Sequence, residues 1–381
     1  MIFLGLASNY RARDILRHLF AFGSKRHHEL LESALASRYG ATRENTALVY
    51  SGRTALALAL ESFLACKKLR PGDHVALNAF TCHAVLEAVQ HAGLTPVFVD
   101  LAPSSPNYSA ESLATACAKD KRLKVFILQN TFGLPVDIES FLEVKQQYNL
   151  LLIEDLAHCA GRFYKLKDGK KQEIGTVGEA TCLSFGKGKA IDTITGGAVI
   201  LRDLSLHFPE SFAKSALARP GVGDRFRARH YPLFAATARE MASFRLEKLR
   251  LWFLLKCQWI ARSADTALDE TLALTNWQAR LALRQLKNLK DAPLREHFLV
   301  ENRDECLNNL RAKGYRLEET WYEVPVAPAR YYASVNFPEK SCPNAVFFAA
   351  HVINLPTWYH DRYHSRQVAE ARKIIKTYEV R

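Results

Sequence analysis

The sequence predicts an α/β protein with a mostly parallel sheet in a large domain and a second, smaller domain. From about residue 45, short runs rich in β-branched residues alternate with longer helical patterns, as in successive βα units. The 381 residues exceed one average domain but suit a large α/β domain and a smaller partner domain. With 48% hydrophobic and 24% charged residues, the composition is that of a globular protein with a sizeable core.

The elements of the predicted sheet follow from local patterns. Strands are expected at 74–78, 95–99, 124–128, 150–153, 181–185 and 197–201, and helices at 83–92, 111–118 and 138–148. Only a short connection separates the last two strands, so we expect the sheet to end in a hairpin. The charged, glycine-containing segment 162–175 is typical of an exposed loop or hairpin.

The second half of the chain starts with a basic segment, 210–265, that is predicted to be largely helical. Within it, 225–230 is interpreted as a solvated or phosphate-facing loop. The stretch 244–262 has the mixed apolar and basic composition of an interfacial membrane helix, although packing in a dimer interface or against its own domain is the more common outcome. A polar helix start at Thr275 opens the smaller domain, and we place the two domains at 28–245 and 270–381.

Charge and cysteine usage narrow the class of partner. A net charge of +13 favours phosphate-bearing ligands, anionic lipid or nucleic acid, but no recognisable nucleic-acid module is present and none is expected as a partner. Eight cysteines lack short CxxC spacing and most histidines lack a ligand pattern, so we expect free thiols and no metal. No apolar stretch reaches the ~20 residues of a membrane span, which favours a cytoplasmic location.

A first cluster with chemical potential is the small, hydroxyl-rich turn 51–56, Ser-Gly-Arg-Thr-Ala-Leu, which precedes a helical run. The N–H groups at a helix start point outward and the helix dipole favours an anion there, so this turn can hold a phosphate. A serine before a helix is, however, often only an N-cap.

A second cluster, Glu154-Asp155-Leu156-Ala157-His158, follows the buried strand at 150–153. A carboxylate at the end of a buried strand is costly unless a cation or a donor group meets it. A protonated pyridine nitrogen is one such partner, and a structural ion pair or a helix N-cap is the alternative.

A third cluster runs from Ser184 to Lys189 and is followed by the glycine pair Gly196 and Gly197. A lysine between small residues in a tight loop can approach an aldehyde, and desolvation there makes its amine more nucleophilic. A glycine-rich basic loop can equally bind a nucleotide phosphate, although the order of residues does not match a P-loop.

Together, the three clusters resemble in order and spacing the DegT/StrS sugar aminotransferases, a family of fold-type I enzymes that depend on pyridoxal 5′-phosphate (PLP). The resemblance covers 28–202 and, more faintly, 270–360. It implies an aspartate-aminotransferase-like fold in which the mostly parallel sheet carries PLP and a smaller α+β domain follows.

The resemblance also assigns roles to individual residues. Lys189 corresponds to the lysine that forms the Schiff base, ahead of its rival Lys187. Asp155 matches the aspartate that meets the pyridine nitrogen, and His158 matches the residue beside the phenolic oxygen of the cofactor. The residues that match the phosphate-binding positions are Gly52, Arg53, Thr54 and Ser184, with Asn276 reaching the phosphate from a partner subunit.

Several residues depart from the family pattern. Arg53 replaces a small residue of the phosphate-binding turn. Cys82 follows Thr81 where relatives often have an aromatic residue that stacks on the cofactor ring, so stacking is expected either to fall to Phe80 or His83 or to be weak. The family's GEGG loop is reduced to Thr195-Gly196-Gly197, which lacks the acid.

The resemblance therefore implies an aminotransferase that moves an amino group, with glutamate as the expected donor, to a keto-sugar attached to a nucleotide, and that works as a homodimer. Two alternatives stay open. One is a PLP-dependent sugar dehydratase, although relatives that eliminate water replace the lysine at position 189 by histidine. The other is a non-catalytic regulator or membrane-associated binding module that keeps the fold.

Overall fold

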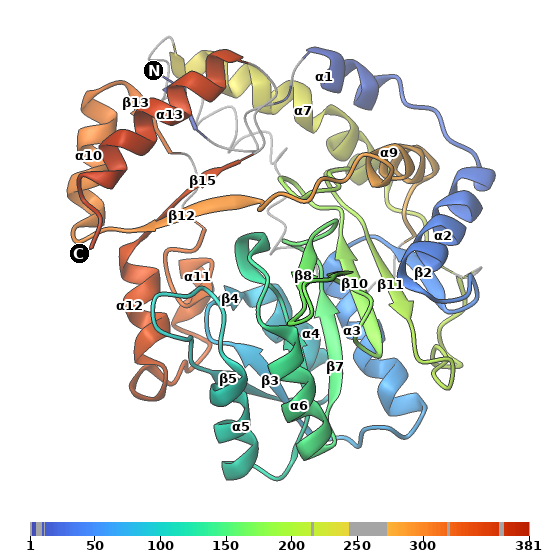
Figure 1. Cartoon of the computed structure of the whole chain (residues 1–381). Helices are drawn as coiled ribbons and strands as arrows, with labels where there is room; N and C mark the ends of the chain where they lie inside the picture. Colours follow the sequence, from blue (N-terminus) through green and yellow to red (C-terminus); the bar gives the residue numbers. More distant parts are fainter. Residues whose placement is uncertain are drawn as a thin grey trace.

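A seven-stranded sheet organises the large domain (Figure 1), in the order β2-β11-β10-β7-β6-β3-β5. The strands are β2 (Thr46–Val49), β3 (His74–Asn78), β5 (Thr95–Val99), β6 (Leu123–Leu128), β7 (Leu151–Asp155), β10 (Ala180–Ser184) and β11 (Gly197–Leu201). Strand β11 is antiparallel to both of its neighbours, while the pairs from β10 to β5 are parallel. The predicted mostly parallel sheet is therefore confirmed.

The computed structural model describes residues 2–4, 10, 12–214, 217–243, 273–317, 321–357 and 362–380. Within these residues no helix is long and apolar enough to cross a membrane. The cysteines in this part of the chain are free thiols. The stretch 244–262, predicted to be amphipathic, lies outside the described residues.

Helices cover both faces of the sheet because its strands are apolar on both sides. In β6, Phe126 and Leu128 belong to one core and Val125 and Ile127 to the other, as the two-residue repeat of a strand requires. The first core is closed by α2 (Lys25–Tyr39), α5 (Ala110–Lys119), α6 (Ile138–Tyr148) and α9 (Asn276–Leu286), and the second by α3 (Gly52–Ala65) and α4 (His83–His91).

The expectation that the sheet ends in a hairpin is wrong. Strands β10 and β11 pair in antiparallel fashion as predicted, but β2 lies beyond β11 and forms the edge of the sheet. The pairing of β2 with β11 joins residues about 150 positions apart, which a local pattern does not reveal. The segment between β10 and β11 carries Lys189.

The structure confirms the prediction for one further segment and contradicts it for another. The predicted hairpin within 162–175 is confirmed, because β8 (Phe163–Lys165) pairs in antiparallel fashion with β9 (Lys171–Glu173). The loop expected at 225–230 is instead part of helix α7 (Val222–Ser243). Arg227 pairs with Asp224 one turn earlier, and Arg229 donates to the carbonyl of Ala21 at 2.8 Å, so local ion pairing and tertiary contacts support helix there.

The smaller C-terminal part is built on the antiparallel pair β12 (Arg295–Leu299) and β15 (Val352–Pro356). Its helices are α10 (Arg303–Ala312), α12 (Pro343–His351) and α13 (Arg362–Lys376). Short elements complete it: β13 (Tyr315–Arg316), β14 (Val326–Ala327), α11 (Ala329–Tyr332) and the 3₁₀ turn η4 (Glu339–Ser341). The N-terminal strand β1 (Ile2–Phe3) pairs with β13, and Leu4 joins the apolar core of this part.

One short pairing ties the two parts together at the carboxyl edge of the sheet. Strand β4 (Thr81–Cys82), just after β3, runs parallel to β14. At the same edge, the 3₁₀ turn η1 (Thr131–Gly133) follows β6 and accepts a hydrogen bond from Leu294 at the start of β12, 2.8 Å from the carbonyl of Phe132. Residues that follow the sheet strands are thus held next to the C-terminal part.

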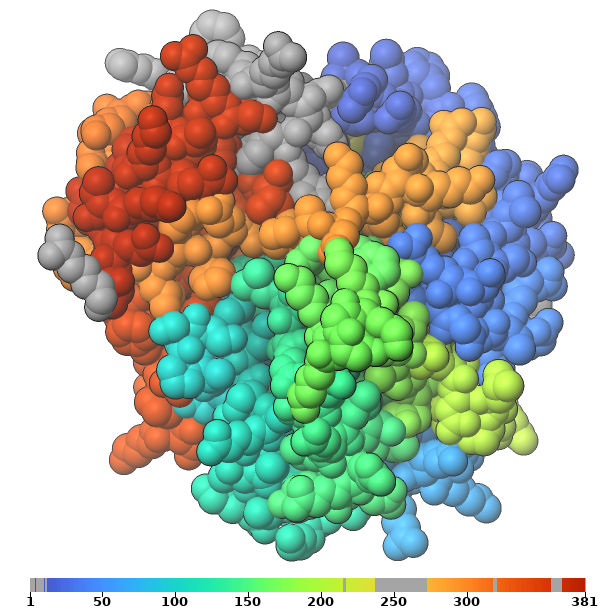
Figure 2. Space-filling model, viewed as in Figure 1, coloured from blue at the N-terminus to red at the C-terminus, as the bar shows by residue number. Residues whose placement is uncertain are grey.

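Helices α1 (Ala12–Leu19) and α7 lie together over α9 at one end of the molecule (Figure 1). Ala21, Ala228, Tyr231, Trp277 and Leu281 form a small apolar cluster between them. In Figure 2 the orange residues around α9 and β12 run between the blue N-terminal helices and the red C-terminal part.

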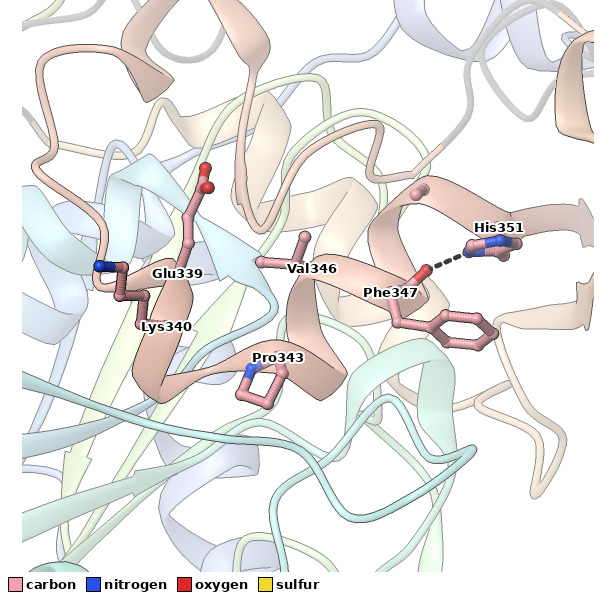
Figure 3. A pocket seen from close by; sticks show the side chains of 7 residues that line it. Glu339, Lys340, Pro343, Val346, Phe347 and His351 are labelled. Carbon is pink, nitrogen blue, oxygen red and sulfur yellow. Dashed lines mark hydrogen bonds between the residues drawn. The ribbon is translucent and has the colours of Figure 1, made fainter.

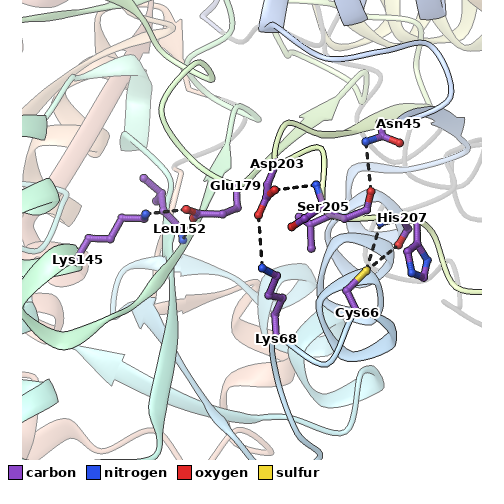
Figure 4. A network of polar contacts seen from close by, with 10 residues as sticks. Asn45, Cys66, Lys68, Lys145, Leu152, Glu179, Asp203, Ser205 and His207 are labelled. Atoms are coloured by element: carbon purple, nitrogen blue, oxygen red, sulfur yellow. Dashed lines mark hydrogen bonds and ion pairs between the residues drawn. The ribbon is translucent and has the colours of Figure 1, made fainter.

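The opposite edge of the sheet, at the amino ends of β7 and β10, is fastened by polar contacts (Figure 4). Glu179 pairs with Lys145 at 2.6 Å and accepts the N–H of Leu152 at 2.7 Å. Nearby, the N–H of His207 donates to the sulfur of Cys66 at 3.2 Å. These contacts stabilise the edge that is farther from the clusters singled out in the sequence.

Candidate functional site

All three clusters predicted from the sequence lie at the carboxyl edge of the sheet. The turn Ser51-Gly52 follows β2, Asp155 ends β7, and Lys189 follows β10. The carboxyl ends of parallel strands share one edge, which is where open α/β sheets bind ligands. The topology therefore brings together segments that are more than a hundred residues apart in the chain.

The two neighbouring acids Glu154 and Asp155 point to opposite faces of β7. Glu154 is fully buried, and its carboxylate accepts the N–H groups of Gly175, Val177 and Gly178 at 2.7–2.8 Å. It also accepts the hydroxyl of Tyr164 at 3.0 Å. Glu154 is therefore engaged in holding the loop before β10.

Asp155 lies on the face of the sheet that α3 and α4 cover, with only 8% of the residue exposed. Its Oδ1 accepts the N–H of Ala157 at 2.9 Å. Burial raises the pKa of this carboxyl, and the backbone hydrogen bond and the positive charge of Lys189 oppose that shift. A buried carboxylate within electrostatic reach of a lysine is the arrangement that the sequence predicted.

His158 is buried in the turn after β7, and its hydrogen bonds define its tautomer. The N–H of Phe132 donates to its Nδ1 at 3.2 Å, so the neutral ring carries its proton on Nε2, which lies 3.3 Å from the hydroxyl of Tyr322. Burial lowers the pKa of His158 well below its ordinary value, and the positive charges of Lys189 and Arg295 lower it further. His158 is a neutral hydrogen-bond donor at pH 7.

Two lysines share the loop after β10, and the structure separates them. The Nζ of Lys187 lies 4.8 Å from the ring centre of Tyr231 in α7, and its charge acts on Asp192. The Nζ of Lys189 lies 4.5 Å from the ring centre of Trp321, and its charge acts on Asp155 and His158. Of the two, Lys189 is the one directed to the acid and the histidine.

The loop that carries Lys189 is braced from two sides. Asp192 accepts the N–H of Gly188 at 2.9 Å and the hydroxyl of Tyr10 at 2.8 Å. From α9, Gln285 accepts the N–H of Asp192 at 2.6 Å, and Gln278 donates to the carbonyl of Thr193 at 3.0 Å. The residue before the lysine is thus fixed by a half-buried carboxyl group.

A tight crossing of backbones forms the predicted phosphate cradle. A Cβ atom added at Gly52 would lie 2.7 Å from the Cβ of Ser184, and one added at Gly197 would lie 2.5 Å from the carbonyl oxygen of Ser51. Only glycine allows these approaches. The first two N–H groups of α3, from Gly52 and Arg53, cannot reach an intrahelical carbonyl and lie next to Ser184 and the glycine pair.

The side chains of the same turn have roles within the protein. Ser51 is the N-cap of α3, since its Oγ accepts the N–H of Thr54 at 3.1 Å and lies 2.9 Å from the Thr54 hydroxyl. Arg53 is buried and forms an ion pair with Glu87 of α4 at 2.8 Å. The N-cap interpretation thus holds beside the phosphate-binding one, and what Arg53 offers a phosphate is its backbone N–H.

The residues expected to stack on a cofactor ring have aromatic partners within the protein. Phe80 is fully buried and packs against Phe132, Tyr322 and Phe348. His83 stacks on Tyr331 with the ring centres 4.6 Å apart. Each of these two rings has an aromatic neighbour in the C-terminal part of the chain.

Asn276 is exposed at the start of α9, after the N-cap Thr275. The backbone of Gly23 lies directly over it, because a Cβ added at Gly23 would lie 1.9 Å from the carbonyl oxygen of Asn276.

Sequence analysis missed the aromatic side chains that the C-terminal part contributes. Trp321 stacks on His158, with ring centres 5.1 Å apart and planes 25° apart, and the guanidinium of Arg295 lies 4.0 Å from the Trp321 ring centre. These residues lie more than 100 positions after Lys189 and follow no periodic pattern. The adjacent pair Trp321-Tyr322 was a weak signal, since ligand pockets are lined mostly by apolar and aromatic side chains but other aromatic pairs, such as Tyr331-Tyr332, occur in the same half of the chain.

A shallow groove of about 490 Å³ lies on α12 (Figure 3), lined by Glu339, Lys340, Pro343, Val346, Phe347, Ala350 and His351. None of the residues predicted from the sequence lines it. The described residues also contain no group of three or more His, Cys, Asp or Glu side chains suited to a metal ion.

The residues at the sheet edge fit PLP. A lysine amine, a buried carboxyl group and a neutral N–H donor lie together, and a glycine cradle at the start of a helix suits a phosphate. The lysine, the carboxyl group and the N–H donor suit the ring of the cofactor with its aldehyde, and the glycine cradle suits its phosphate.

Comparison with known proteins agrees with this geometry. A sequence model of the DegT/DnrJ/EryC1/StrS aminotransferase family matches residues 9–371. The chain is 25% identical over 334 residues to UDP-N-acetyl-3-dehydro-alpha-D-glucosamine 3-aminotransferase of Acidithiobacillus ferrooxidans, which covers 86% of this chain and 82% of that protein. It is 29% identical over 315 residues to dTDP-3-amino-3,4,6-trideoxy-alpha-D-glucose transaminase of Streptomyces venezuelae, with 82% and 77% covered.

The fold is also similar to solved structures. A protein assigned as a sugar aminotransferase from Streptococcus pneumoniae, solved in its PLP form, matches with a TM-score of 0.62 at 17% identity, over 97% of this chain and 98% of that one. The predicted aspartate-aminotransferase-like fold is therefore confirmed.

Proposed function

The chain belongs to the DegT/DnrJ/EryC1/StrS aminotransferase family, and on that premise we propose that it binds PLP through Lys189 and aminates a keto-sugar attached to a nucleotide. The observation that carries the proposal is the convergence of Lys189, Asp155 and His158 at one edge of the sheet. The same edge holds the glycine cradle around Gly52.

When bound, PLP supplies a site that can accept the electron pair left when the Cα–H bond of the amino donor is broken. Asp155 faces the ring nitrogen and keeps a proton on it, because the buried carboxylate is stabilised by that positive charge. The Nε2–H of His158 donates to the phenolic oxygen. Both residues act by charge and orientation.

Lys189 has two duties. It would hold the cofactor between turnovers, and its amine is the group placed to take up and return the proton of the substrate Cα. The same residue acts first as base and then as acid. The bracing of its loop by Asp192 and Gln285 keeps the amine within reach.

The phosphate is held by the N–H groups of Gly52 and Arg53, the hydroxyls of Thr54 and Ser184, and Asn276 of the partner subunit. A homodimer is part of the proposal, because Asn276 is exposed at the start of α9 and is therefore open to contact from a second chain. A cytoplasmic location is also part of it.

The substrate class is proposed from two relatives, whose names specify UDP- and dTDP-linked sugars. A net charge of +13 suits a nucleotide diphosphate as well as an acidic amino donor. Glutamate is the proposed donor, since it carries a second carboxylate for a basic entrance.

Absorbance spectroscopy tests the proposal. The purified protein is expected to be yellow or to become so with PLP, and to lose the visible band of lysine-bound PLP in Lys189→Ala. Addition of glutamate is expected to bleach the band as the cofactor takes the amino group, and a nucleotide-linked keto-sugar to restore it. A protein that stays colourless with added PLP contradicts the enzyme assignment.

The two alternatives give different results in the same experiment. A sugar dehydratase would consume a nucleotide-linked sugar with loss of water, yet Lys189 stands where the dehydratases described above have histidine. A non-catalytic relative would bind PLP but keep its visible band in the presence of every amino donor tested.

A further inference from the structure

Trp321 is the aromatic side chain that contacts both Lys189 and His158. Its ring centre lies 4.5 Å from the Nζ of Lys189 and 5.1 Å from the His158 ring, to which it is nearly parallel. A flat group that is attached to Lys189 and hydrogen-bonded to His158 would lie beside the same two residues that Trp321 contacts. Parallel aromatic rings at such separations attract one another.

Other rings near the site are engaged elsewhere. Phe80 is fully buried in an apolar cluster that it forms with residues of α12, and His83 stacks on Tyr331. Phe132 is also fully buried, with its ring centre 6.2 Å from that of His158. Trp321 combines partial exposure with contact to the lysine.

The position of Trp321 is set from the C-terminal part of the chain. The guanidinium of Arg295, itself 1% exposed, lies 4.0 Å from the Trp321 ring centre and donates to Asn354 at 2.6 Å. The amide of Asn354 in turn donates to the carbonyl of Trp321. Two adjacent strands, β12 and β15, thus fix the tryptophan before any ligand binds.

The family's stacking position is held by a small residue in this chain. Four residues after Tyr322, strand β14 pairs with β4, which ends in Cys82. Burial raises the pKa of the Cys82 thiol, and the nearby charges of Lys189 and Arg53 oppose that shift. A thiol cannot offer an aromatic face, whereas Trp321 can.

We propose that Trp321, held by Arg295 and Asn354, is the aromatic side chain that packs against the PLP ring in this protein. The inference rests on the proposed function, since it requires PLP on Lys189. It assigns to the C-terminal part of the chain a direct contribution to cofactor binding.

The test compares PLP affinity in three variants, measured by titrating the apoprotein and following the visible band. Trp321→Leu removes the ring and is expected to raise the Kd about tenfold, which equals about 1.4 kcal/mol. Trp321→Phe keeps an aromatic face and is expected to stay within about threefold of the parent. Phe337→Leu, a partly buried ring that packs on Phe98, is the matched control and is expected to leave the Kd unchanged.

A second readout is the visible circular dichroism of bound PLP, which reports the surroundings of the ring. Trp321→Phe is expected to change this signal even though the protein stays folded and loaded. An unchanged signal in Trp321→Phe, or a Kd in Trp321→Leu that equals or falls below that of the parent, overturns the proposal; the tighter binding would mean that Trp321 obstructs the site. A parent protein that fails to bind PLP rejects the proposed function as well, whereas normal parent binding with unaffected variants rejects only the role of Trp321.

Discussion

Glu154 and Asp155 are chemically similar neighbours with separate tasks. Glu154 meets three backbone N–H groups and a tyrosine hydroxyl, and Asp155 meets one N–H and the charge of Lys189. The alternation of a β-strand sends them to different surroundings. One acid therefore stabilises the loop before β10, and the other faces the site.

Substitution of the two acids is expected to separate stability from chemistry. Glu154→Gln places an NH₂ group against backbone donors and is expected to lower the free energy of unfolding by about 3 kcal/mol. Asp155→Asn is expected to lower kcat at least about 100-fold, or about 2.7 kcal/mol in the barrier, while the free energy of unfolding changes by less than about 1 kcal/mol because a buried charge is removed. Urea denaturation and steady-state kinetics of both variants check this, and a Glu154→Gln protein of normal stability would contradict the account.

His158 gives the protein part of its pH dependence. Burial holds the pKa of His158 well below 6.5 in the folded protein, so below pH 6.5 the unfolded chain takes up a proton that the folded one does not. Stability is therefore expected to fall as the pH drops from 6.5, with up to about 1.4 kcal/mol per pH unit from this residue.

Urea denaturation of the apoprotein at pH 7.0, 6.5, 6.0 and 5.5 measures that slope. In His158→Gln, the slope of the free energy of unfolding against pH is expected to be smaller than in the parent by up to about 1.4 kcal/mol per pH unit. Other histidines with a pKa lowered by burial, such as His18 and His297, contribute equally to both proteins. Parallel slopes in the two proteins would show that folding leaves the pKa of His158 unchanged.

Among the elements, the start of α3 is the proposed phosphate site because the backbones of α3, β10 and β11 approach one another closely there. Gly52 faces the Cβ of Ser184 with no room for a side chain. Gly52→Ala is expected to push α3 away from the end of β10 and to raise the PLP Kd at least about tenfold, or about 1.4 kcal/mol.

A glycine in open space serves as the control for this substitution. Gly93 has no atom within 4 Å of an added Cβ, but its φ is +69°, so Gly93→Ala introduces backbone strain without crowding. It is expected to lower stability and to leave the PLP Kd unchanged in the folded protein. Equal PLP affinity in Gly52→Ala and the parent would mean that the cradle does not hold the phosphate.

Local patterns predicted the elements well where a short apolar run is bounded by polar or turn-forming residues. Residues 74–78 and 95–99 are strands with the predicted bounds. The edge strand β2 and the helix at 225–230 were not predicted, because the first depends on pairing with a distant strand and the second on contacts with Asp224 and Ala21. The periodicity of apolar residues shows which face of a helix or strand is buried, but not which other element covers that face.

The candidate site was predictable only in part. Asp155, His158 and Lys189 come from motifs at the carboxyl ends of parallel strands, and the topology places such ends side by side. The pairing of Arg53 with Glu87 and the approach of Trp321 depend on packing between elements, which no spacing in the sequence reveals. Motifs thus indicated the groups that we propose to react and left their surroundings undetermined.

At the scale of the whole molecule, the site combines both parts of one chain, and in our proposal it also takes Asn276 of the partner subunit. Two inactive variants then become complementary. A dimer of one Lys189→Ala chain and one Asn276→Ala chain contains one site with both residues intact, since each site takes its lysine and its asparagine from different chains.

Co-expression of the two variants tests this arrangement. Each variant alone is expected to be strongly impaired, and the mixture is expected to recover up to about a quarter of the parent activity, because about half of the dimers are mixed and each has one complete site. Recovery no greater than the sum of the separate variants would place Asn276 outside the neighbouring site.

The central claim is that the amine of Lys189 carries the cofactor. Borohydride reduction of the PLP-loaded protein makes the C–N linkage permanent, and mass spectrometry of the digested protein then locates the pyridoxyl group. The account predicts the group on Lys189, with Lys187 in the same peptide unmodified. A pyridoxyl group on Lys187, on a lysine outside the loop after β10, or on no lysine at all would contradict it.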